Sequence, residues 1–118
     1  MTMGKRRKPS KLLATKLDKD GLKSRVREWG DIIGVEVDEI HVKPMKRKWA
    51  SISTNGHRMT LNDELLSKPL DFCDYAIVHE LVHVKVPNHG KLFKALMSAH
   101  IPDWDKYAQL EENILDRR

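Results

Sequence analysis

The spacing of the hydrophobic residues changes along the chain and divides it into elements. From Leu17 to Gly30 they recur every three to five residues, which predicts a helix with one apolar face. Segment 35–42 alternates apolar and polar residues with one slip in the period and predicts a strand. Two more β-prone runs, 49–53 and 57–61, flank Thr-Asn-Gly, and Asn-Gly between such runs strongly predicts a β-hairpin.

The rest of the chain has the spacing of helices. Asp71 can cap a helix that stops near Pro87, because the residue before a proline is disfavoured in the α region. Further helices fit 90–100 and, after Pro102, 103–115. This order of elements, with one helix first, then the strands and then only helices, predicts an α+β domain with a small antiparallel sheet.

Composition narrows the class of protein. A chain of 118 residues with 40% hydrophobic and 33% charged residues is typical of one globular domain. It has neither an apolar run as long as a membrane span nor a secretory signal, so we expect a cytoplasmic protein with no membrane partner. Since Cys73 is the only cysteine, Cys-rich zinc and iron–sulfur sites are excluded, and any metal must be held by His, Asp or Glu.

The positive charge is concentrated at the N-terminus. Residues 1–16 carry six Lys or Arg and no acid, more than the whole net charge of +5, so residues 17–118 are close to neutral. We expect a basic, flexible tail over 1–16 and a single folded domain over 17–118. The tail allows a weak contact with nucleic acid, although it lacks aromatic residues that stack on bases.

The second predicted helix contains His79-Glu80-Leu81-Val82-His83. Residues four apart lie on one helix face, so both imidazoles can reach a single metal ion, for which Zn²⁺ is the natural choice. Glu80 lies about 100° around the helix and can face a water held by the metal, whose proton it can accept. Catalytic zinc sites usually have a third protein ligand, and His89, just beyond Pro87, is the candidate.

These motifs resemble the YgjP-like metallopeptidase-domain family, which is distantly related to the SprT and WLM zinc proteases. The similarity lies in 75–83, in Pro87-Asn88-His89-Gly90 with Phe93, in 47–53, in Leu61-Asn62 and in Pro102-Asp103. It implies a minimal zincin-like hydrolase, with the hairpin packed on an active-site helix. It also implies that His79, His83 and His89 bind the metal and that Glu80 is the general base.

Folds of that kind pair an extended peptide with an edge strand, and 49–53 is the natural candidate here. Arg47, Trp49 and Ser51 are therefore candidate substrate-binding residues. Arg47 could instead be solvated, and Trp49 could fill the core.

Two residues near the last helix have two interpretations each. His100 could stabilise an oxyanion, as could Tyr107, or it could simply complete a helix end. Asp103 could accept a hydrogen bond from a metal-ligating imidazole or cap the helix that follows it.

Three functions remain open at this point. The first is a zinc metallopeptidase acting on a peptide or protein. The second is a zinc hydrolase of a nucleotide or another phosphate substrate, with Lys46, Arg47 and Lys48 as phosphate contacts. The third is a DNA-associated module stabilised by zinc. Glu80 favours the enzymes, because a structural zinc site does not need a base.

Overall fold

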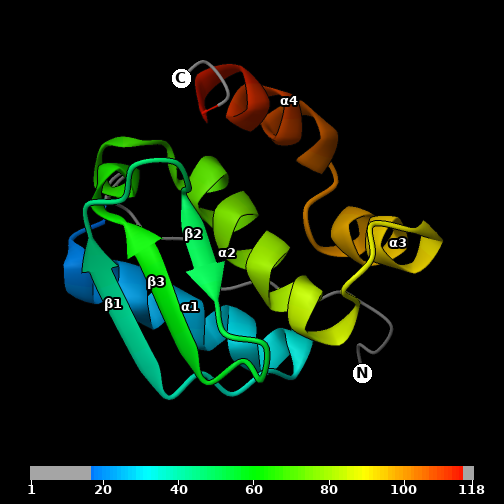
Figure 1. Cartoon of the computed structure of the whole chain (residues 1–118), viewed down its shortest axis with the longest axis horizontal. Helices are drawn as coiled ribbons and strands as arrows, with labels where there is room; N and C mark the ends of the chain where they lie inside the picture. The colour runs from blue at the N-terminus through cyan, green and yellow to red at the C-terminus, as the bar shows by residue number, and fades with distance from the viewer. Residues whose placement is uncertain (1–16, 116–118) are drawn as a thin grey trace, which may run out of the picture.

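The computed structural model describes residues 17–115, which form helices around a small sheet (Figure 1). In chain order the elements are α1 (Lys19–Ile33), β1 (Glu39–Lys43), β2 (Ala50–Ile52), β3 (Arg58–Asn62), the 3₁₀ helix η1 (Asp63–Ser67), α2 (Leu70–Lys85), α3 (Lys91–His100) and α4 (Trp104–Leu115). The predicted α+β class is confirmed. The predicted tail, residues 1–16, lies outside the described residues.

The strand order is β1-β3-β2. β2 and β3 pair antiparallel, with Ala50 opposite Leu61, which confirms the hairpin. Its turn uses both predicted residues: Asn55 Oδ1 accepts from the His57 N–H at 3.0 Å, and Gly56 adopts a φ of 82°, which favours glycine.

The antiparallel prediction is wrong for β1, which runs parallel to β3 with Ile40 opposite Met59. After β1 the chain crosses one end of the sheet, descends through β2 and returns through β3 between the other two strands (Figure 1). The alternation of side chains has the same period in parallel and antiparallel strands, so the sequence pattern does not encode this direction.

Several element boundaries differ from the sequence predictions by a few residues. β1 begins at Glu39 rather than at residue 35, because Val35 and Val37 are buried in a connection that precedes the ladder. The residue that caps α2 is Pro69 rather than Asp71, which instead lies in the first turn of the helix. A carboxylate there still interacts favourably with the helix dipole.

Helix α2 forms the centre of the molecule and lies between the sheet and the pair α3 and α4 (Figure 1). Nine of its residues are buried, and Ile77, Val78 and Leu81 are fully inaccessible to solvent. Contacts to α1, α3 and β2 surround it, so an almost uniformly apolar helix is stable in this place. None of the described helices is long and apolar enough to cross a membrane.

A buried ion pair joins α1 to α2. Arg25 is a charged residue of α1, yet it is only 5% exposed. Its Nε and Nη2 donate to the two carboxylate oxygens of Asp74 at 2.8 and 2.9 Å, and Trp29 Nε1 donates to Asp74 Oδ1 at 2.9 Å. The hydrogen bond that Arg25 donates to Asp74 raises the pKa of Arg25 above its ordinary value. This fixed, bidentate geometry sets how α1 lies against α2.

Asn62 holds the connection between β1 and β2. Its Oδ1 accepts from the Glu64 N–H at 3.0 Å, so the side chain caps η1. Its Nδ2 donates to the carbonyl oxygens of Met45 and Lys48 at 3.0 and 2.9 Å. One buried amide therefore fixes the 44–49 connection at the end of the sheet where α2 begins (Figure 1).

Candidate metal centre

His79 and His83 lie one helical turn apart on the same face of α2, as their spacing requires. Their ring centroids are 4.8 Å apart and both residues are half-buried. The helix ends at Lys85, and Pro87 cannot continue it. The chain therefore turns before α3 begins at Lys91.

This turn brings His89 back to the first two histidines. The Nε2 atoms of His83 and His89 are 2.8 Å apart, so one ring donates a hydrogen bond to the other. One nitrogen from each of His79, His83 and His89 falls within 4.8 Å of the other two. In residues 17–115 no other group of three His, Cys, Asp or Glu side chains is arranged to hold a metal ion.

Phe93 on α3 forms the floor beneath the three histidines. Its ring centroid lies 4.6 Å from that of His89, 4.7 Å from His83 and 5.5 Å from His79. The ring is 2% exposed, so it excludes water from one side of the cluster. The sequence identifies Phe93 only as part of the family motif, and its spacing of four from His89 is the available signal.

Glu80 hydrogen bonds with the neighbouring histidine. His79 Nδ1 and Glu80 Oε2 are 3.1 Å apart, and the two side chains are 21% and 20% exposed. If Nδ1 carries the proton and donates to this carboxylate, the lone pair of His79 is on Nε2, where a metal can use it. Glu80 Oε1 keeps its own capacity to accept a proton.

Burial lowers the pKa of His83, and the nearby His79 and His89 lower it further, against an opposing effect of Glu80. A lowered pKa favours the neutral imidazole, the form that donates a lone pair to a metal. Two nitrogens bound to one tetrahedral zinc lie about 3.3 Å apart. The 2.8 Å contact therefore needs only a small opening, and the three side chains fit such an ion.

The candidate substrate-binding residues lie in three different settings. Arg47 is exposed on the connection that Asn62 holds. Trp49 is 2% exposed and packs edge-on against Phe72, so the structure makes it a core residue and not part of a cleft. Ser51 pairs with Thr60 on the sheet face opposite the core residues Met59 and Leu61.

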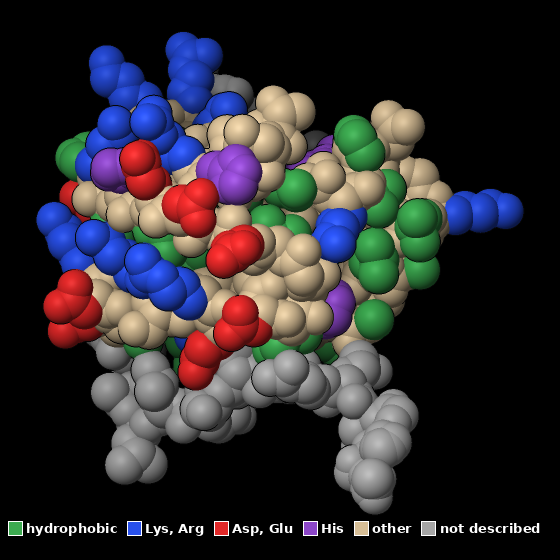
Figure 2. Space-filling model, turned by 90° about the horizontal axis from the view of Figure 1, so that it is seen from below, with side chains coloured by type: hydrophobic (Ala, Val, Ile, Leu, Met, Phe, Trp, Pro, Cys, Tyr) green, Lys and Arg blue, Asp and Glu red, His purple; other side chains and the backbone are tan. Residues whose placement is uncertain are grey.

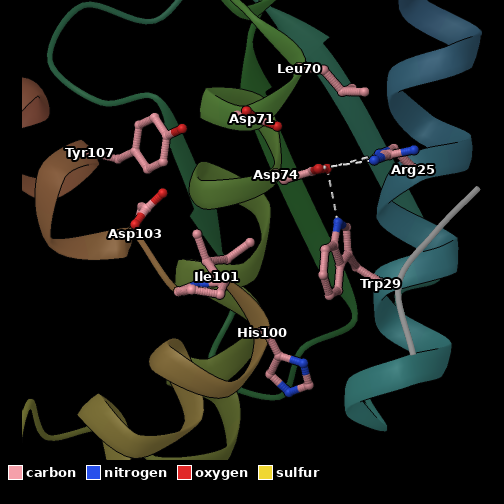
Figure 3. A pocket seen from close by; sticks show the side chains of 10 residues that line it. Arg25, Trp29, Leu70, Asp71, Asp74, His100, Ile101, Asp103 and Tyr107 are labelled. Atoms are coloured by element: carbon pink, nitrogen blue, oxygen red, sulfur yellow. Dashed lines mark hydrogen bonds and ion pairs between the residues drawn. The ribbon is translucent and has the colours of Figure 1, made fainter. Parts of the chain in front are cut away.

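His100 and Asp103 do not join the histidine cluster. They line a separate cavity of about 260 Å³ between α1, α2 and α4, together with Asp74 and Tyr107 (Figure 3). Asp103 makes no hydrogen bond to His79, His83 or His89, so its predicted role beside a metal ligand is not supported. Burial raises the pKa of Tyr107, and nearby carboxylates, including Asp103, raise it further.

This arrangement agrees with a family comparison. The model of the YgjP-like metallopeptidase domain matches residues 4–113, which include all the residues of the histidine cluster and the whole sheet. The chain belongs to this family. The match begins at residue 4, inside the stretch that we expected to be a tail.

Solved structures agree with this membership. The metallopeptidase zymogen jannalysin of Methanocaldococcus jannaschii is 28% identical, with a TM-score of 0.67 over 84% of this chain and 100% of its own. The metallopeptidase zymogen abylysin of Pyrococcus abyssi is 20% identical, with a TM-score of 0.67 over 82% of this chain and 97% of its own, and shows the same fold. No curated protein matches the chain. Family and fold together support a metallopeptidase.

Proposed function

We propose that the chain is a zinc-dependent metallopeptidase in which His79, His83 and His89 hold the metal and Glu80 is the general base. One observation carries the proposal: nitrogens of three histidines from α2 and from the turn after it gather within 4.8 Å, next to a half-buried carboxylate. Membership of a metallopeptidase family supports the reaction class.

The three ligands are neutral imidazoles, so the ion would keep its full double charge. When bound, zinc supplies a Lewis acid that polarises a carbonyl and lowers the pKa of a water to about 7. Two aromatic side chains reduce the access of water to this site. Phe93 is buried beneath the histidines, and the ring centroid of Tyr75 lies 5.6 Å from that of His79.

Glu80 provides the proton transfer. Its Oε2 is engaged with His79 Nδ1, which fixes the direction of the carboxylate, and Oε1 accepts the proton of the water that attacks the peptide carbonyl. The same oxygen then returns the proton to the leaving amine. With 20% of its side chain exposed, Glu80 is accessible from solvent and still held in place.

A peptide can reach this site along β2. Trp49 and Ser53 bond to β3 through their backbone, with the Asn62 N–H donating to Trp49 and the Ser53 N–H donating to Arg58. Because these directions alternate in an antiparallel ladder, the backbone groups of Ala50 and Ile52 face the other edge. No described strand pairs there, and α2 lies alongside (Figure 1), so an extended peptide can add to this edge.

Two measurements on the purified chain test the proposal. Metal analysis should give one zinc per chain for the parent and for Glu80→Gln, and much less for His79→Ala and His83→Ala. Mass spectrometry of a peptide library should show cleavage by the parent and a loss of about 10²- to 10⁴-fold or more in Glu80→Gln. Full zinc content in the histidine variants would refute the ligand set, and full turnover in zinc-loaded Glu80→Gln would refute the base.

A separate measurement tests whether the peptidase is made in an inactive form. Jannalysin is a zymogen, so we expect this chain to share a latent form, and activity should be measured before and after limited proteolysis. Cleavage of peptides only after proteolysis would support latency. Equal activity in both samples would refute latency and leave the metallopeptidase assignment standing.

A further inference from the structure

The two ends of β2 differ in charge. At the hairpin end, acids and bases pair: His57 Nδ1 lies 2.8 Å from Asp38, and Arg58 Nε donates to Glu39 at 3.0 Å. Figure 2, which views the molecule from this end, shows acidic, basic and histidine side chains intermixed. This end therefore presents acidic as well as basic side chains.

At the opposite end, the last residue of β1 and the connection to β2 carry exposed cations and no acid. We call them the basic loop: Lys43, Lys46, Arg47 and Lys48. Residues 40–62 contain no Asp or Glu, and within the described residues none of the four forms an ion pair.

Charges on neighbouring elements leave this end positive. Lys68 adds a cation, because its Nζ lies over the Trp49 ring at 5.4 Å from the centroid. Asp63 and Glu64 follow β3 and offset part of the charge. Asp71 lines the cavity between α1 and α4.

The basic loop is held in position rather than left to move as a solvated turn. Asn62, 3% exposed, donates to the carbonyl oxygens of Met45 and Lys48, on both sides of Lys46 and Arg47. Holding the backbone reduces the conformational entropy that a bound ligand would have to remove. The cations therefore form a preorganised group.

The distance from this group to the histidines follows from the helix. Trp49 contacts Phe72 with ring centroids 5.2 Å apart, so the start of β2 is level with Phe72. Phe72 precedes His79 by about two helical turns, or about 10 Å. An extended peptide covers about 3.3 Å per residue, so it spans this distance with about three residues.

We propose that the substrate is a polypeptide with acidic residues about three to five positions from the cleaved bond, on one side of it, which contact Lys46, Arg47 and Lys48. The inference rests on the proposed function, since it assumes a peptide paired with β2. A nucleic acid fits less well: Trp49 is 2% exposed, so the patch lacks an aromatic side chain on which bases stack.

The first experiment maps cleavage. The full chain is incubated with a random peptide library, and Asp and Glu should be enriched three to five residues from the cut on one side only. An exposed charge pair changes affinity by about 1.5- to 5-fold, so two or three acids should raise kcat/KM by about ten-fold over matched Gln peptides. Cleavage with no acidic preference would overturn the inference and leave the proposed function intact.

The second experiment measures binding without catalysis. Fluorescence anisotropy gives the affinity of zinc-loaded Glu80→Gln protein for an acidic peptide. This affinity should fall about ten-fold when Lys46, Arg47 and Lys48 are all changed to Ala. The matched control changes Lys19, Lys23 and Arg27 of α1 to Ala, removes the same charge and should keep the affinity.

Each outcome of the binding experiment decides between the two proposals. Loop-dependent binding without cleavage by the parent would support the acidic partner and count against the peptidase. Equal weakening by the two triple variants would overturn the basic loop as a specific site. Tighter loop-dependent binding of a DNA duplex than of the acidic peptide would overturn it in favour of a nucleic acid.

Discussion

Replacing Asp74 by alanine should destabilise the fold more than any exposed substitution, although the residue lies outside the histidine cluster. The carboxylate is 8% exposed and accepts three hydrogen bonds, two from Arg25 and one from Trp29. Its removal leaves the buried guanidinium without this counter-charge.

Breaking a buried pair by removing one partner costs about 3–5 kcal/mol. The lost bond from Trp29 Nε1 places Asp74→Ala in the upper half of that range. Changing Arg25 to Met and Asp74 to Leu together removes both charges and should cost far less, within about 2 kcal/mol of the parent, because apolar packing replaces the pair. The remaining cost is the unsatisfied indole N–H.

Urea unfolding followed by circular dichroism measures these differences, provided that the m-value is unchanged. Asp71→Ala is the matched control, since Asp71 is exposed in the first turn of α2 and should change stability by less than about 1 kcal/mol. If Asp74→Ala cost no more than Asp71→Ala, or if the double variant were as unstable as the single one, the reasoning from the uncompensated charge would fail.

Three further predictions test other parts of the molecule. Asn62→Ala should lower the free energy of unfolding by about 2–3 kcal/mol, because it removes a cap and two bonds to carbonyls; a loss below about 0.5 kcal/mol would contradict this. Burial raises the pKa of Cys73 to about 12, so iodoacetamide at pH 8 should label only urea-unfolded protein, and rapid labelling of the native protein would show that the thiol is accessible. DNA binding, if measured, should fall steeply with salt and be lost in a chain that starts at Leu17; retained affinity there would exclude the first 16 residues as its source.

Local patterns predicted the helices and the hairpin because their signals lie within a few residues. His79 and His83 need only a helix to lie together, and Asn55-Gly56 forms a turn with little help from the rest of the chain. The approach of His89 was also predictable, since α2 ends before Pro87 and His89 follows His83 by only six residues.

The features that the sequence could not predict depend on contacts between distant residues. Arg25 and Asp74 each look like an ordinary solvated charge, and only the packing of α1 on α2 pairs them. His100 ends α3 and Asp103 belongs to the Pro-Asp motif that follows, and both line another cavity. The direction of β1 depends on the path of the 44–49 connection, which no period in the sequence records.

The strand order has a consequence for synthesis. β1 and β2, the first two strands to leave the ribosome, are the two outer strands of the sheet, and neither pairs with the other. Until β3 emerges, the nascent chain has no ladder to form between them. A pause at the stage when β2 has left the ribosome and β3 has not therefore exposes two unpaired strands, whereas once β3 has also emerged the hairpin can close within microseconds and offer β1 its template.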